Sequence, residues 1–205
     1  MLHTVFVSYN RLELLKETVF SYLDTVTVPH TFTVVDNKSD DETQRWLHNS
    51  GFSYHLLSKN RYPGFACNLG WEGAPKDATL LHRSDNDMRY LPGWCDEVLE
   101  RFQDPTLGQL GLRTLEEEGN HPNVGGSCVI RRELWDKGLR YDERPWSELP
   151  FEDGLMSYRV RKLGFAVVRA QQPCVEHIGI ASSEDPYYQQ TFADRRITFA
   201  EWGVA

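Results

Sequence analysis

The chain has 205 residues, 40% of them hydrophobic and 12% aromatic, which is enough for one domain with a full core and excludes an intrinsically disordered chain. Its 22 basic and 30 acidic residues give a formal net charge of −8 without any run of Lys or Arg, so we expect no broad binding to a nucleic-acid backbone. The four cysteines are widely spaced and form no C-x-x-C motif, which signals neither a zinc cluster nor a disulfide framework and favours reduced thiols in a cytoplasmic protein.

The sequence contains no signal for membrane insertion. No stretch approaches the roughly 20 consecutive apolar residues that a membrane-spanning helix needs. The N-terminus, from Met1 to Val5, leads directly into an apolar run and lacks the layout of a signal peptide. We therefore expect a cytoplasmic protein without an integral membrane segment.

The first half of the chain alternates between β-branched or aromatic runs and segments with helical signals. Strands are predicted at residues 4–8, 31–35, 53–57 and 78–81, and helices from about residue 10, at 40–47, around 64–71 and from about 93 to 102. Asn10 is the expected cap of the first helix, in which Leu12, Leu15, Val19 and Tyr22 fall on one face. This alternation predicts an α/β domain with a mostly parallel central sheet flanked by helices.

The pattern changes after residue 105. Strands are predicted at 110–112, at the end of 124–130 and at 165–169, and helices at 132–138 and 150–163, each stopped by a glycine. His177 lies in a short segment at 175–178. The tail from Tyr187 to Trp202 is rich in aromatic residues; a helix packed on the core is favoured over a lid for a bound ligand.

Three polar clusters stand at predicted strand ends: Ser8 to Asn10, Asp36 with Asn37, and Ser84 to Asp87. Ligands of parallel α/β sheets bind at the carboxyl ends of strands, so these clusters are expected to converge. Asp85 and Asp87 follow a buried run, where two carboxylates are costly unless something positive lies between them. A divalent metal carrying a diphosphate is the obvious candidate, although an isolated D-x-D sequence is usually a solvated loop.

Taken in order, these motifs resemble those of glycosyltransferases with the GT-A fold, of the broad family 2 type. The matching segments extend over about residues 1–180 and are Val7–Arg11, Val34–Ser39, Asn60, Gly64–Ala66, Asn68–Gly70, Asp85–Asp87, Gly125–Ser127, Arg131–Arg132, Glu152–Leu155 and His177. The chain departs from the family in being short and in the segment 115–123, which has no clear counterpart. It also departs at His82 and Arg83, where the family is usually more apolar.

The resemblance implies a single GT-A, Rossmann-like domain. Residues 1–105 would form a nucleotide-binding half, 106–180 an acceptor and catalytic half, and 181–205 a C-terminal helical tail. The implied reaction moves a sugar from a nucleotide-diphosphate sugar, most often a UDP-sugar, to an acceptor hydroxyl. Because direct displacement needs one base and one stabilised leaving group, and the chain offers one of each, the expected outcome is inversion at the sugar carbon.

The resemblance also assigns roles to residues. Asp87 and His177 are the expected metal ligands, and a carboxylate with an imidazole suits Mn²⁺, with Mg²⁺ as the alternative. The expected donor-binding residues are Ser8, Asn10, Arg11, Asp36, Asn68, Asp85 and Asn86. For Asp36 with Asn37, an ordinary turn is the competing interpretation.

On the acceptor side, Asp153 is the expected general base and Glu152 is expected to position the acceptor or support the base. The two residues could exchange roles, and acidic residues at a helix start are also expected from the helix dipole alone. Trp146 and Gly126 are further acceptor-side candidates; ordinary packing for Trp146 and a strand bulge for Gly126 are the competing interpretations.

Two other functions stay open at this point. A sugar-nucleotide pyrophosphorylase would need a glycine-rich loop after the first strand, and Ser8 to Arg11 contains no glycine. A non-catalytic sugar-nucleotide or glycan-binding module of the same fold is disfavoured by the intact Asp87, Asp153 and His177. The absence of G-x-G-x-x-G after the first strand disfavours a dinucleotide oxidoreductase. The acceptor could be a glycan, a protein, a lipid-linked sugar or a modified base.

Overall fold

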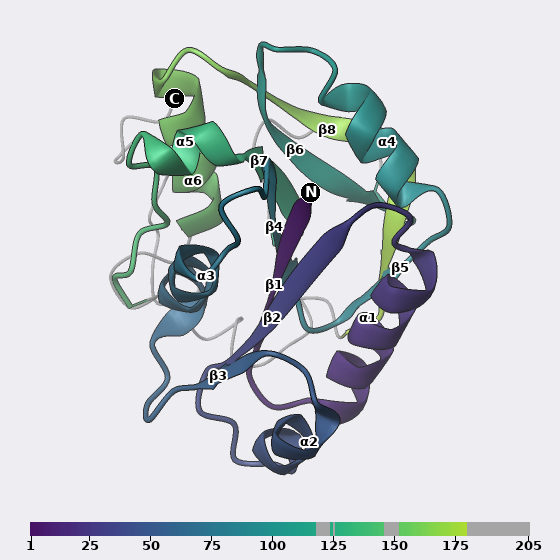
Figure 1. Cartoon of the computed structure of the whole chain (residues 1–205), viewed down its shortest axis with the longest axis vertical. Coiled ribbons are helices and arrows are strands. Elements are labelled where there is room, and N and C mark those ends of the chain that lie inside the picture. Colours follow the sequence, from purple (N-terminus) through teal and green to yellow (C-terminus); the bar gives the residue numbers. More distant parts are fainter. Residues whose placement is uncertain (118–123, 125, 146–151, 180–205) are drawn as a thin grey trace.

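A computed structural model describes residues 1–117, 124, 126–145 and 152–179 of the chain. One mixed β-sheet lies between two groups of helices (Figure 1). The predicted helical tail at 181–205 and the acceptor-side candidate Trp146 fall outside the described residues.

The sheet has eight strands in the described part of the chain, in the order β3-β2-β1-β4-β7-β6-β8-β5. Their bounds are β1 Leu2–Ser8, β2 His30–Asp36, β3 Tyr54–Leu56, β4 Leu80–Asp85, β5 Met88–Tyr90, β6 Leu107–Thr114, β7 Cys128–Arg131 and β8 Ala166–His177. The pairs β1–β2, β1–β4, β2–β3 and β6–β8 are parallel, whereas β7 is antiparallel to β4 and β6, and β5 to β8. The predicted α/β fold with a mostly parallel sheet is confirmed.

Helices cover both faces of the sheet. They are α1 Leu12–Thr25, α2 Thr43–Ser50, α3 Tyr62–Glu72, α4 Trp94–Arg101, α5 Arg132–Asp136 and α6 Glu152–Lys162. Figure 1 shows α1 and α4 on one side of the sheet and α3, α5 and α6 on the other. Strand β1 is buried along its whole length, as a strand covered on both faces should be. Its alternating side chains serve two cores, with Phe6 in the cluster beside α1 and α4 and Val5 in the cluster beside α3, α5 and α6.

The sheet must curl because β4 and β5 are joined by two residues yet lie far apart in the strand order. Three Cα–Cα steps from Asp85 to Met88 span at most about 11 Å. In a flat sheet the four interstrand steps from β4 through β7, β6 and β8 to β5 would span about 19 Å. The short link therefore draws the β8–β5 edge back toward the carboxyl end of β4, so that His177, opposite Met88 in the register, approaches Asp87.

The start of α1 differs from the prediction. Asn10 and Arg11 both have left-handed backbone conformations, with φ of 54° and 63°, and Arg11 occupies the cap position without a side-chain cap. Asn10 as the helix cap was therefore wrong. Its side-chain Oδ1 instead accepts a hydrogen bond from the Asp40 backbone N–H at 2.8 Å, and Asp41 Oδ2 accepts the N–H of Leu12. A loop distant in the sequence thus supplies the acceptor that a local side chain was expected to provide.

None of the helices in the described part of the chain combines the length and the apolar character needed to cross a membrane.

Gly70 is predicted to be required for the contact between α3 and β1. A Cβ at this position would lie 2.4 Å from Val5 Cγ2. We expect Gly70→Ala to lower the free energy of unfolding by about 1–3 kcal/mol through overpacking, measured by urea denaturation. Gly73→Ala is the control, because a Cβ there meets its nearest neighbour at 3.6 Å. Equal stability of the two variants would contradict the tight α3–β1 contact.

Candidate active site

The first cluster of the site is built around Asp87, in the turn between β4 and β5. Its carboxylate Oδ2 accepts a hydrogen bond from Arg11 Nη1 at 3.0 Å and lies 3.3 Å from His177 Nε2. The backbone of Ile178 donates to the Asp87 carbonyl at 2.9 Å. Gly179 passes so close that a Cβ would lie 2.4 Å from Asp87 Oδ2. The end of β8 is thereby fixed against the turn that carries Asp87.

The predicted metal ligands Asp87 and His177 are thus brought together. The hydrogen bond with Asp87 raises the pKa of His177 above its ordinary value, although burial opposes this shift. Within the described residues, no three His, Cys, Asp or Glu side chains gather as a potential metal site. A carboxylate oxygen and an imidazole nitrogen near one point nevertheless fit Mn²⁺ or Mg²⁺, provided that diphosphate oxygens or water supply the remaining ligands.

The second cluster is an ion-pair bridge inside the molecule. Arg83 Nη2, from β4, lies 3.3 Å from Asp85 Oδ1 and 3.1 Å from Glu152 Oε1. The Arg83 and Glu152 side chains are only 4% and 6% exposed, so this pair is shielded from water. Burial raises the pKa of Glu152 to about 7, while Arg83 acts in the opposite direction and Asp153 adds to the increase.

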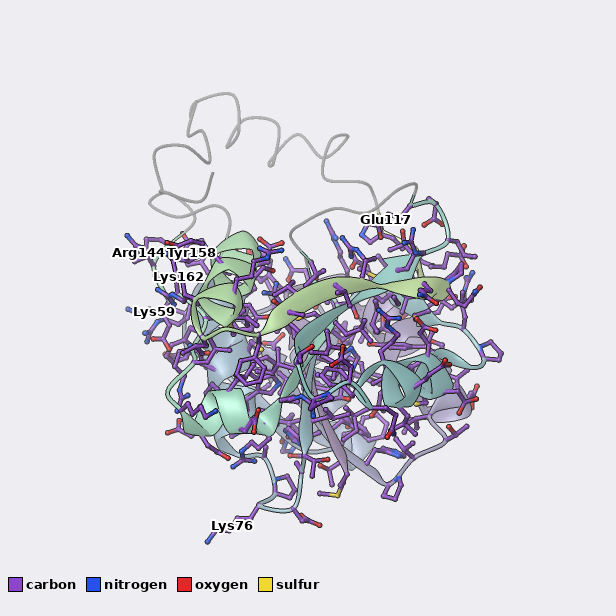
Figure 2. All side chains as sticks on the ribbon, turned by 90° about the horizontal axis from the view of Figure 1, so that it is seen from above. Lys59, Lys76, Glu117, Arg144, Tyr158 and Lys162 are labelled. Atoms are coloured by element: carbon purple, nitrogen blue, oxygen red, sulfur yellow. The ribbon has the colours of Figure 1, made fainter. Side chains whose placement is uncertain are left out.

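The N-terminus of α6 carries the two predicted catalytic residues. Glu152 is buried and Asp153 is partly buried, with Asp153 Oδ1 accepting the N–H of Gly154 at 2.7 Å. Figure 2 shows Tyr158 and Lys162, further along the helix, at the outer edge of the molecule. The face of α6 that carries Glu152 and the buried Met156 therefore points inward.

Gly126, predicted on the acceptor side, lies against the donor-side acid Asp85. A Cβ on Gly126 would be 1.9 Å from Asp85 Oδ2, so only glycine allows this approach without displacement of the aspartate. Gly126 therefore lies at the junction between the predicted donor and acceptor sides.

Two of the predicted donor residues lie near the carboxyl ends of neighbouring strands: Asn86 is in the turn between β4 and β5, and Ser8 is at the end of β1. The Asn86 side chain donates to the Asn10 carbonyl at 2.9 Å, which ties the turn to the residues after β1. Ser8 is fully buried, and its Oγ has no hydrogen-bond partner among the described residues. An unsatisfied buried hydroxyl at this strand end is a natural contact for a bound polar ligand.

Two other predicted donor residues hold loops in the structure. The Asp36 carboxylate is fully buried and accepts hydrogen bonds from the Ser39 backbone at 3.0 Å, the Ser39 hydroxyl and Gln44 Nε2 at 2.8 Å. Asn68, from α3, hydrogen-bonds both the N–H and the carbonyl of Tyr141 at 3.0 Å. These contacts fix the loops after β2 and α5, and any donor contact of Asp36 and Asn68 stays a prediction.

Two residues of the site were missed by the sequence reasoning. Gly179 gave no signal. Arg83 did give one, since a charged residue in a buried strand departs from the family pattern, as does His82. Arg83 and His82 point to opposite faces of the sheet: Arg83 lies over Tyr141, while His82 hydrogen-bonds Thr4 and Ser127.

Ligands of open α/β sheets bind at the carboxyl ends of the strands, which is where Asp85 and Asp87 lie in this sheet. The chain belongs to glycosyl transferase family 2, whose model matches residues 4–164, well over half of the sequence. No curated protein matches the chain by sequence.

Solved structures share the fold at low sequence identity. A mannosyltransferase, PcManGT from Pyrobaculum calidifontis in complex with GDP-Man and Mn²⁺, is 18% identical with a TM-score of 0.70, over 88% of this chain and 57% of that one. TarS 1–349 from S. aureus in complex with UDP-GlcNAc is 15% identical with a TM-score of 0.67, over 98% of this chain and 68% of that one. The chain thus spans less than two thirds of the mannosyltransferase.

The contact between Asp87 and His177 predicts a titration difference between two histidines. In metal-free buffer, His177 should titrate above its ordinary pKa of 6.5, and Asp87→Asn should lower its midpoint. His82 is the internal control, because burial lowers its pKa to about 3 and keeps it neutral. NMR of the imidazole resonances from pH 5 to 9 measures both.

The same shift has a stability consequence with a defined sign. Because the pKa of His177 is raised on folding, its stabilising contribution is complete below about 6.5, the unfolded value, and is lost as the pH rises through the folded pKa. A His177 midpoint at or below 6.5 in the unsubstituted protein would contradict the observed contact.

Proposed function

We propose that this chain is an inverting, metal-dependent glycosyltransferase that moves a hexosyl group from a UDP-sugar to an acceptor hydroxyl. The observation that carries the proposal is the meeting of two clusters at one end of the sheet: Asp87 with His177, and Asp85 with Glu152 through Arg83. Family membership supports the transferase class. The division into a nucleotide-binding half, an acceptor half and a tail is part of this proposal.

On the donor side, Asp87 and His177 are the proposed metal ligands. A bound Mn²⁺ or Mg²⁺ would neutralise the charge that develops on the departing diphosphate. Arg11, which lies on Asp87 in the structure, is suited to bind a phosphate oxygen when the metal takes its place. Ser8, Asn10, Asp36, Asn68, Asp85 and Asn86 complete the proposed donor-binding set.

On the acceptor side, Asp153 is the proposed general base. The acceptor oxygen attacks the sugar carbon from the face opposite the diphosphate, the bond to the diphosphate oxygen breaks, and the hydroxyl proton passes to Asp153. One displacement inverts the configuration at that carbon. Glu152 supports the base and Gly126 leaves room beside Asp85; Trp146 stays an acceptor-side proposal.

The choice of donor rests on analogy. The structural neighbours are bound to GDP-Man and to UDP-GlcNAc, so both base types occur on related folds. We favour a UDP-sugar because such donors are commonest in the family that the motifs resemble.

A thermal-shift panel of nucleoside diphosphates, with and without Mn²⁺, tests the proposed donor. Ligand at 100 times its Kd should add about 2.7 kcal/mol of stability, which for a domain of this size corresponds to a rise in Tm of about 5–10 °C. UDP with Mn²⁺ should give the largest shift. Shifts without hydrolysis or transfer for any sugar nucleotide would instead favour a binding module, and UTP formation from a UDP-sugar and pyrophosphate would favour a pyrophosphorylase.

Removal of the proposed metal ligand should weaken the metal-dependent part of donor binding. We expect Asp87→Ala to lower Mn²⁺-dependent UDP affinity by about 10- to 100-fold, the scale seen when support for a bound metal is lost. Calorimetry with and without Mn²⁺ measures this effect, and the exposed Asp77→Ala is the matched control. Unchanged Mn²⁺-dependent affinity in Asp87→Ala would remove Asp87 from the metal site.

Replacement of the proposed base should separate binding from chemistry. Asp153→Asn keeps the size of the side chain but accepts no proton, so kcat for transfer should fall by about 100- to 10,000-fold while donor Kd is unchanged. Steady-state kinetics and calorimetry on the same preparation make the comparison, with Asp77→Asn as control. Near-normal turnover would place the base elsewhere.

A further inference from the structure

Arg83 is unusual because it is a cation in a central, buried strand. It is 3% exposed, and its neighbours Ser84 and His82 are fully buried. Burying a charge in this way costs several kcal/mol unless partners compensate it. A residue that only filled space in β4 would be apolar, so the contacts of the guanidinium should explain its presence.

Those contacts join two distant parts of the chain. The same nitrogen, Nη2, reaches Asp85 at the end of β4 and Glu152 at the start of α6. Nε and Nη1 are buried and have no hydrogen-bond partner among the described residues. Within that part of the chain, the two carboxylates are the groups that compensate the cation.

The other side of the guanidinium is fixed by an aromatic ring. Its central carbon lies 4.9 Å from the centre of the Tyr141 ring, within the range of a cation–π contact. Tyr141 is itself held at both backbone groups by Asn68, and its hydroxyl lies 3.2 Å from Cys128 Sγ. Arg83 therefore has little freedom to move away from the two acids.

We propose that Arg83 is a positioning residue that fixes the first turn of α6, and with it Asp153, relative to the donor-side Asp85. This inference rests on the proposed glycosyl transfer. Glu152 is the link, since it precedes Asp153 directly and bonds Arg83 at 3.1 Å. Loss of the bridge frees the helix start from β4, and a displacement of about 1 Å at a reacting group costs up to about 100-fold in rate.

The kinetic test compares Arg83→Met, which keeps the length and burial, with Arg83→Lys, which keeps the charge. We expect Arg83→Met to lower kcat by about 10- to 100-fold with donor KM changed less than about threefold, and Arg83→Lys to recover part of the loss. The Arg83→Met/Glu152→Gln double variant should lose no more than Arg83→Met alone. The exposed Arg45→Met is the control and should be unaffected.

The pH dependence of stability provides a readout that needs no activity. Glu152 faces Arg83, Asp153 and Asp85, and Arg83 lowers a Glu152 pKa that burial raises. Without Arg83 that pKa rises further. Both proteins should lose stability as the pH rises above about 4.5, the unfolded value, but the loss should level off near pH 7 in the unsubstituted protein and continue above pH 7 in Arg83→Met. Glu152→Gln should remove this difference, and urea midpoints from pH 5 to 9 measure it.

The two tests separate the failure of this inference from failure of the proposed function. If the unsubstituted protein transfers no sugar, the proposed function fails, and the urea series still decides whether Arg83 is coupled to Glu152. Unchanged kcat in Arg83→Met, additive effects of Arg83→Met and Glu152→Gln, or a loss of stability without any change in kcat would each overturn the positioning role. If Arg83→Met does not fold, wild-type kcat in Glu152→Gln, which breaks the same bridge, overturns it as well.

Discussion

The two-residue link between β4 and β5 is the constraint on which the rest of the site depends. It joins a central strand to the last strand in the sheet order, and the sheet satisfies it only by curling. Curling brings the end of β8, with His177, beside Asp87. Without that closure the two residues would lie at separate parts of the sheet. The geometry of the candidate metal site is thus a consequence of strand topology.

Compensation of charge explains how so many acids are tolerated at one end of the sheet. The protein carries a formal charge of −8, yet Asp87 is bonded by Arg11 and His177, and Asp85 and Glu152 by Arg83. The two arrangements differ in their exposure. Arg11 is one-third exposed, whereas Arg83 is sealed inside the domain. This difference agrees with the roles proposed for them, substrate binding for Arg11 and a fixed bridge for Arg83.

The sequence predicted the features that depend on local patterns. The buried run of β1, the acids Asp85 and Asp87 at the carboxyl end of a strand, and the acidic start of α6 follow from hydrophobic periodicity and from the resemblance to the family, although β4 extends to Asp85 and not only to the predicted residue 81. The start of α1 was misjudged because Asp41 Oδ2 accepts the Leu12 N–H, whereas Asn10 Oδ1 is occupied by the N–H of Asp40. That contact is tertiary, and no local pattern encodes it.

Long-range contacts account for the other differences between the predictions from the sequence and the structure. Strand β5 is three residues long and pairs with β8, so its short sequence carried no periodic signal of its own. The hydrogen bonds that occupy Asp36 and Asn68 come from residues that follow the strand end or lie far along the chain. Arg83 was visible as a charge in an apolar run, but its partner Glu152 is known only from the folded chain.

The most direct test of the account is a crystal structure of the protein with UDP and Mn²⁺, recorded with anomalous scattering from the metal. The account predicts a manganese peak within coordination distance of Asp87 and His177, with the diphosphate oxygens on the same ion and Arg11 moved from Asp87 to a phosphate. A manganese ion bound elsewhere, or UDP bound away from the carboxyl ends of β1 and β4, would contradict it.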